Sequence, residues 1–106
     1  MIASDRGLFG DNGPYGISKS GLINYTKGLA RDLIQYGIRV NAVAPGMTAT
    51  AINNISPTDN LYREFIHGKR VILPEEIAEI VVFLLSDAAK CIAGDVIICD
   101  EGESLR

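Results

Sequence analysis

The segment from Pro14 to Tyr36 distributes apolar and polar residues with the period of an α-helix. Apolar residues stand at helical spacings at Ile17, Leu22, Ile23, Leu29, Leu33 and Ile34. Lys27, Arg31, Asp32 and Gln35 occupy the other side. The pattern predicts one long amphipathic helix. Gly37 follows this segment, and it predicts the C-terminal cap of the helix.

Two strands and a second helix are expected after this cap. The run from Ile38 to Ala44 alternates toward Pro45, where a strand must stop because proline has no N–H for the ladder. Pro74-Glu75-Glu76 is typical of a helix N-terminus, and apolar positions continue that helix to Leu85, before Ser86 and Asp87. The β-branched run Val96 to Cys99 predicts a strand buried on both faces. Strands that alternate with helices indicate an α/β fold with a parallel sheet.

Between these elements, residues 47–69 are rich in Thr, Asn, Ser, Pro and Asp, with only scattered apolar residues. This composition predicts a mobile, partly helical excursion that could serve as a lid.

Length and composition limit the possible classes. The chain has 106 residues, of which 47% are hydrophobic and 22% charged, as expected for a single small globular domain rather than a disordered chain. The net charge of -3 argues against nucleic-acid and anionic membrane partners. The longest apolar run, residues 80–85, is too short to cross a bilayer. Because Met1 to Arg6 carry no secretory signal pattern, we expect a cytoplasmic protein.

No metal site is expected. Cys91 and Cys99 stand eight residues apart, outside metal-type spacings, and two thiols in a reducing compartment are more often packed side chains than a disulfide. His67 is the lone histidine, and it is expected to be a surface residue.

Candidate chemistry begins with Tyr15 and Lys19, which stand four residues apart. On a helix, the phenol and the ammonium would lie on one face, one turn apart, where the cation favours the ionised phenol. Such a phenol can exchange a proton near neutral pH. The pair alone is a weak signal, because solvated pairs at this spacing are common on helices.

The surrounding segments carry a stronger signal. Ser4-Asp5-Arg6-Gly7 begins eleven residues before Tyr15, and Asn41 to Thr50 spans the next strand and the turn after it. With Pro74 to Ala78 and Ile92 to Ile98, these segments resemble the short-chain dehydrogenase/reductase family, and in particular its 3-oxoacyl-acyl-carrier-protein reductases. The resemblance covers essentially the whole chain in the family's order.

The resemblance implies a catalytic role for three residues. Tyr15 matches the catalytic acid/base, and Ser4 matches the hydroxyl that polarises the substrate carbonyl. Lys19 matches the residue that assists the tyrosine and holds the nicotinamide ribose, so Tyr15 and Lys19 also contact the cofactor. The alternative for Ser4 is a capping or turn serine.

The same resemblance implies a cofactor, NAD or NADP. The residues that match the segment positioning its carboxamide and phosphates are Pro45, Gly46, Thr48 and Thr50. Thr50 could instead be only a helix N-cap.

Other features depart from the family pattern. No glycine-rich phosphate loop follows a strand, because Gly7, Gly10 and Gly13 lie between the serine and the tyrosine. The serine-to-tyrosine gap is about two residues shorter than in many members, and Asp100-Glu101-Gly102 replaces a common Asp-Gly-Gly. Residues 1–106 are therefore expected to be one partial domain, the C-terminal half of an NAD(P)-binding Rossmann-type domain.

The expected fold is a truncated, doubly wound parallel sheet with strands at Met1 to Ser4, Ile38 to Ala44 and Val96 to Cys99. The expected function is hydride transfer between NAD(P)(H) and a ketone, alcohol or acyl-thioester, with this chain alone inactive. The alternative is a non-catalytic interaction or scaffold domain derived from the family. An exposed sheet edge and apolar helix faces favour a homo-oligomer or a complementing N-terminal half as partner.

Overall fold

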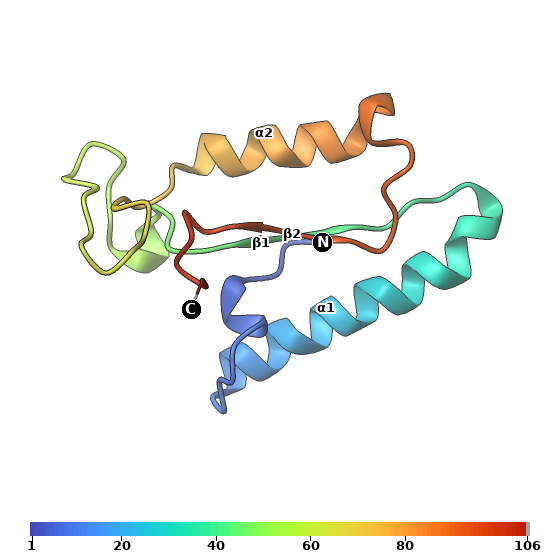
Figure 1. Ribbon diagram of the computed structural model, residues 1–106, viewed down its shortest axis with the longest axis horizontal. Coiled ribbons are helices and arrows are strands. Elements are labelled where there is room, and N and C mark those ends of the chain that lie inside the picture. Colours follow the sequence, from blue (N-terminus) through green and yellow to red (C-terminus); the bar gives the residue numbers. More distant parts are fainter. Residues whose placement is uncertain (106) are drawn as a thin grey trace.

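A small parallel sheet lies between two helices in the computed structural model, which describes residues 1–105 (Figure 1). Strands β1 (Ala42–Pro45) and β2 (Val96–Cys99) pair in parallel, with Ala42 opposite Val96. On the other side of β1, Val43 donates to the carbonyl of Met1 and accepts from the N–H of Ala3. β1 is therefore the central strand, between the N-terminal segment and β2.

Helix α1 (Pro14–Leu33) covers one face of this sheet. A 3₁₀ turn continues it to Tyr36, and Gly37 ends it with a φ of 74°. The predicted helix from Pro14 to Tyr36 and its glycine cap are thus confirmed. Burial of Ile23 against Ala3, Ala42 and Ala44 explains why the apolar side of the helix faces the strands.

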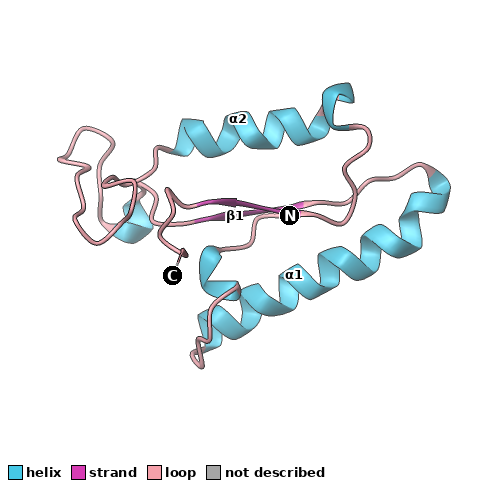
Figure 2. Cartoon of the chain, in the orientation of Figure 1, coloured by secondary structure: helices cyan, strands magenta, loops and turns pink. Residues whose placement is uncertain are grey.

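Helix α2 (Pro74–Leu85) covers the opposite face, as Figure 2 shows. Leu84 packs with Val43 and Ala89 in a second apolar cluster. The Glu76 carboxylate accepts the N–H of Leu73 at 2.9 Å, which satisfies a backbone donor at the helix start. The predicted bounds of this helix are confirmed, including its end before Ser86.

Three strand predictions need correction. β1 begins at Ala42 rather than Ile38, because the backbone before Ala42 does not bond to a strand: the N–H of Ile38 donates to the carbonyl of Leu33 at 3.3 Å, and the carbonyl of Val40 accepts the N–H of Gly94 at 2.8 Å. The expected strand at Met1 to Ser4 is reduced to a bridge at Ile2, because Ser4 already caps a short 3₁₀ helix.

The third correction concerns the burial of β2. Ile97 packs in the cluster beneath α2 and Val96 packs against the cluster beneath α1, but Ile98 joins neither and is 49% exposed. None of the four residues of β2 is fully buried, so the expectation that β2 is buried on both faces is wrong.

The segment between β1 and α2 contains only one short 3₁₀ helix, Ala51–Asn53. Its two ends meet through a parallel bridge between Thr48 and Ile72. Ile66 and Val71 are fully buried within it. The segment is partly helical as predicted, whereas a role as a lid stays a prediction.

Neither helix among residues 1–105 is long and apolar enough to cross a membrane.

Candidate active site

A cleft of about 580 Å³ opens where the N-terminal segment and β1 end. Side chains from four parts of the chain line it, among them Ser4, Asp5, Tyr15, Met47 and Glu103. The carboxyl ends of parallel strands are where α/β folds bind ligands. The cleft therefore combines a hydroxyl and a phenol at a favourable edge of the sheet.

Ser4 is buried at the wall of this cleft. Its Oγ accepts the N–H of Arg6 at 3.2 Å, which makes it the cap of the 3₁₀ helix Asp5–Gly7. The same hydroxyl donates to Asp5 Oδ1 at 3.3 Å. The capping alternative for Ser4 thus holds, and the capping side chain also lines the cleft.

Tyr15 stands in the first turn of α1, between the helix-starting Pro14 and the buried Gly16, and is 52% exposed. One turn later, Lys19 places its Nζ 5.7 Å from the centroid of the Tyr15 ring. Nζ also donates to the carbonyl of Ile2 at 3.2 Å. The structure therefore brings Tyr15 and Lys19 together on one helix face, although Lys19 does not line the cleft.

The segment after β1 contributes Gly46 to the cleft. A Cβ at Gly46 would lie 2.7 Å from the Cβ of Asp100, so only glycine allows the C-terminal turn to approach this closely. Pro45, Thr48 and Thr50 do not line the cleft, and Thr50 lines a separate hollow with Ala49 and Pro57.

Both threonines bond to nearby backbone. Thr48 Oγ1 donates to the carbonyl of Gly46 at 3.0 Å, and Thr50 Oγ1 donates to that of Thr48 at 3.5 Å. Thr50 stands at the N-cap of the 3₁₀ helix Ala51–Asn53, but its side chain makes no capping hydrogen bond there.

Two acidic residues of the cleft were not predicted as site residues. Asp5 is only 4% exposed, and this burial, with the charges of Glu103 and Asp100, raises its pKa to about 6. Glu103 has a buried oxygen, Oε2, with no hydrogen-bond partner among residues 1–105. Asp5 could have been noticed beside Ser4, whereas no local pattern marks Glu103.

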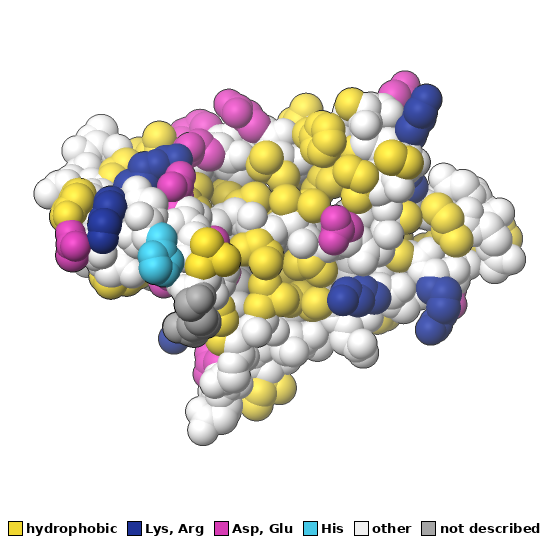
Figure 3. Space-filling view, in the orientation of Figure 1, with side chains coloured by type: hydrophobic (Ala, Val, Ile, Leu, Met, Phe, Trp, Pro, Cys, Tyr) yellow, Lys and Arg dark blue, Asp and Glu magenta, His cyan; other side chains and the backbone are white. Residues whose placement is uncertain are grey.

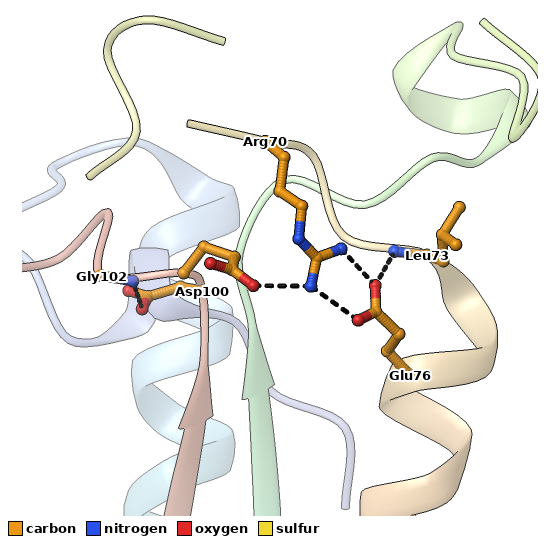
Figure 4. A network of polar contacts seen from close by, with 6 residues as sticks. Arg70, Leu73, Glu76, Asp100 and Gly102 are labelled. Carbon is orange, nitrogen blue, oxygen red and sulfur yellow. Dashed lines mark hydrogen bonds and ion pairs between the residues drawn. The ribbon is translucent and has the colours of Figure 1, made fainter. Parts of the chain in front are cut away.

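A polar network holds the C-terminal turn that carries Glu103. Arg70 bonds both oxygens of Glu76, at 2.5 and 2.6 Å, and the carboxylate of Glu101 at 2.6 Å (Figure 4). The Arg70 hydrogen bonds hold the pKa of Glu76 at about 2. Asp100 accepts the N–H groups of Gly102 and Ser104, at 2.9 Å each. The turn is therefore tied both to itself and to α2.

A family described as "Enoyl-(Acyl carrier protein) reductase" matches residues 1–104 of the chain. The chain belongs to the short-chain dehydrogenase/reductase family. It is 40% identical to the 3-oxoacyl-[acyl-carrier-protein] reductase FabG of Chlamydia trachomatis, over 95% of this chain and 42% of FabG. It is 38% identical to dehydrogenase/reductase SDR family member 4 of Bos taurus, over 85% of this chain and 34% of that protein.

Solved structures of this short-chain family share the fold. Acetoin dehydrogenase YohF of Salmonella typhimurium matches with a TM-score of 0.88 and 32% identity, over 98% of this chain and 43% of that one. A 4-hydroxyisoleucine dehydrogenase complexed with NADH matches with a TM-score of 0.86 and 29% identity, over 96% and 44%. These matches confirm the truncated Rossmann-like fold. The chain spans about two fifths of the length of the FabG relative.

The cysteines and the histidine considered as metal ligands lie outside the cleft. Cys91 and Cys99 are free thiols. Cys91 is exposed, so the expectation of packed cysteine side chains is wrong for this residue, whereas Cys99 is partly buried and this burial raises its pKa. His67 is exposed and lies 3.0 Å from the carbonyl of Leu105. No group of three potential metal ligands occurs in the described part of the chain.

Proposed function

We propose that the protein is an oxidoreductase that transfers a hydride between NAD(P)(H) and a carbonyl or alcohol substrate. The observation that carries this proposal is the meeting of Ser4 and Tyr15, from different elements, in one cleft at the carboxyl edge of the sheet. Residues 1–106 would form the C-terminal, catalytic half of an NAD(P)-binding domain. The relatives named FabG reductase and acetoin dehydrogenase support carbonyl chemistry as the shared reaction class.

The cleft suits the nicotinamide end of such a cofactor. Its volume of about 580 Å³ lies within the usual range for small-molecule sites, and Gly46 lines it without a side chain. Lys19, whose Nζ donates to the carbonyl of Ile2, would hold the ribose, and the loop Pro45, Gly46, Thr48 and Thr50 would flank the carboxamide and phosphates. When bound, the nicotinamide ring supplies or accepts the hydride.

Side chains of this chain would carry out the proton transfer to the substrate oxygen. During reduction, Tyr15 would donate its phenolic proton to the oxygen that becomes an alkoxide. Ser4 would donate a hydrogen bond to the same oxygen and so stabilise its developing charge. Lys19 Nζ lies 5.7 Å from the centroid of the Tyr15 ring, so a positive charge stands on the same helix face as the proton donor.

A chimaera tests this proposal. The chain is joined behind the part of Chlamydia trachomatis FabG that precedes the matched segment, and NADH and NADPH oxidation is followed with ketone and acyl-thioester substrates. We expect turnover, and we expect Tyr15→Phe to lower kcat by roughly 10²-fold or more, the usual scale for a positioned general acid. Tyr25→Phe, on the same helix and also exposed, is the matched control and should keep full activity.

Two outcomes would contradict the proposal. If Tyr15→Phe retained the parent's turnover, Tyr15 would not be the proton donor. If the folded chimaera bound a dinucleotide but transferred no hydride, the scaffold alternative would be favoured.

A further inference from the structure

The carboxyl group of Asp5 lies against the hydroxyl of Ser4 within the wall of the cleft. Both residues are almost fully buried, at 4% and 6% exposure, and Ser4 Oγ lies 3.3 Å from Asp5 Oδ1. A serine hydroxyl has one proton to donate and two lone pairs. Here the proton points to Asp5, while Oγ accepts the N–H of Arg6 at 3.2 Å. In this arrangement Ser4 has no proton free for a molecule in the cleft.

The groups around Asp5 favour its neutral form. Burial is the largest cause of its raised pKa, and the charges of Glu103 and Asp100 from the C-terminal turn raise the pKa further. Directly after β1, Gly46 lies close to Asp5: an added Cβ at Gly46 would stand 3.1 Å from Asp5 Oδ2. The hydrogen bonds from Ser4 and from the N–H of Arg6 act in the other direction and lower the pKa.

The cations nearest in the chain are directed elsewhere. The Arg6 guanidinium pairs with Asp11 at 3.6 Å and is largely exposed. From α1, Lys19 bonds to the Ile2 carbonyl, and Tyr15 lines the same cleft. Within residues 1–105, Asp5 has no ion-pair partner. A charge on its carboxylate is therefore stabilised by the hydrogen bonds from Ser4 and from the N–H of Arg6 rather than by a cation.

We infer that Asp5 is a positioning residue that sets the direction of the Ser4 hydroxyl. When ionised, the carboxylate accepts the serine proton and turns it away from the cleft. When protonated, the carboxyl donates its own proton to Ser4 Oγ, and the serine proton is free to turn toward a substrate oxygen. The proton comes from solvent and stays on Asp5, so none passes to the substrate. The effect of this switch on catalysis rests on the proposed function. The hydrogen bond between Ser4 and Asp5 is observed independently of that function.

Side-chain NMR of the full chain tests the inference without an activity assay. The Asp5 carboxyl carbon and the Ser4 Cβ are followed between pH 3.5 and 8.5. We expect both to titrate with one midpoint near pH 6. Asp5→Asn should abolish the Ser4 transition, and Ser4→Ala should raise the Asp5 midpoint because a hydrogen bond to the carboxylate is lost. Asp87→Asn, an exposed residue after α2, is the matched control and should change neither.

Glu103→Gln provides a second variant if Asp5→Asn fails to fold. It removes one neighbouring negative charge, so the midpoints of Asp5 and Ser4 should move together to lower pH. The inference is overturned if Ser4 does not respond while Asp5 titrates, if the two midpoints move separately, or if Asp5 titrates near pH 4.

The chimaera supplies the functional measurement. Its kcat/KM should fall as pH rises through the Asp5 midpoint, and Asp5→Asn should remove that fall. If NMR shows the coupled titration but the chimaera transfers no hydride, the positioning role stands and the proposed function fails.

Discussion

Ser4, Tyr15 and Lys19 form the smallest unit on which the proposed reaction depends. Tyr15 and Lys19 are related by one turn of α1, so their spacing predicted a shared helix face, and Lys19 Nζ lies 5.7 Å from the centroid of the Tyr15 ring. Ser4 reaches the same cleft from a different element, as the cap of the 3₁₀ helix Asp5–Gly7. Ser4 and Tyr15 meet because this 3₁₀ helix packs against α1. A Cβ at Gly7 would come within 2.8 Å of the Lys19 backbone, so the close packing requires glycine.

At the residue scale, Asp5 should make stability fall with rising pH. Its folded pKa of about 6 exceeds its ordinary value of 3.8, so between these values the folded state binds more protons than the unfolded state. Stability is therefore lost as pH rises from about 4 to about 6, by up to roughly 3 kcal/mol for this group. Urea unfolding at pH 4, 5, 6 and 7 should show this decline, and it should be absent from Asp5→Asn.

The exposed carboxylate of Asp87 provides the control for this measurement. Asp87→Asn should leave the decline between pH 4 and pH 6 in place. If Asp5→Asn showed a decline of the same size, titratable groups other than Asp5 would cause the fall in stability.

At the scale of elements, the Arg70 network joins three segments far apart in sequence. Arg70 directly follows the excursion of residues 47–69, Glu76 lies in the first turn of α2, and Glu101 follows β2. Glu101 adopts a left-handed φ of 54°, and its carbonyl accepts the N–H of Gly68 at 2.7 Å. Side chain and backbone of this one residue therefore both attach the C-terminal turn to the excursion, which explains why glutamate can occupy a position where glycine is common.

Arg70→Ala should destabilise the protein by roughly 1 kcal/mol, because it removes a bidentate, partly exposed ion pair. The effect should be full above pH 4.5 and should shrink as pH falls toward 2, since the pKa of Glu76 is lowered from 4.5 to about 2. Urea midpoints across this range measure it. Arg31→Ala removes an exposed pair with Asp32 and should change stability by less than about 0.5 kcal/mol. Equal effects of the two variants would contradict a structural role for Arg70.

At the scale of the whole molecule, the exposed apolar surface is the main feature. Figure 3 shows hydrophobic side chains gathered over α2 and the sheet. Val82 and Leu85 on α2 are 67% and 79% exposed, and Ile17 and Tyr25 on α1 are 60% and 58% exposed. Both helices therefore present apolar residues on the sides that face away from the strands, a pattern that favours association.

We expect this chain to associate in solution. Sedimentation velocity across a concentration series should show the weight-average mass rising with concentration. Replacing Val82 and Leu85 by lysine should weaken this association, because charged side chains resist burial at an interface. Lys27→Ala, on an exposed position of α1, is the control and should leave the mass distribution unchanged. A single monomer species over the whole range would contradict the expectation.

Dinucleotide binding by these 106 residues alone should be weak. The sequence contains no glycine-rich loop after a strand, and that loop supplies the main phosphate contacts in Rossmann-type sites. Titration calorimetry with NADH and NADPH should therefore show no binding tighter than about 1 mM, near 4 kcal/mol of binding free energy. Micromolar binding would show that the cofactor contacts lie elsewhere in the chain.

The sequence by itself determined the features that depend on local order. The helices from Pro14 and from Pro74, the Gly37 cap and the one-turn relation of Tyr15 and Lys19 could all be predicted, because helical periodicity and caps involve neighbours within a few residues. The motif order was also sufficient to predict the family.

Tertiary structure alone decided the features that require distant segments to meet. β1 starts four residues later than its alternating pattern predicts, because the backbone groups of Ile38 and Val40 bond to Leu33 and Gly94, which lie outside any strand. Glu103 enters the cleft only because the C-terminal turn folds back across Gly46, and burial there changes the proton affinity of Asp5. Burial and charge proximity depend on three-dimensional distance, which periodicity along one segment does not encode.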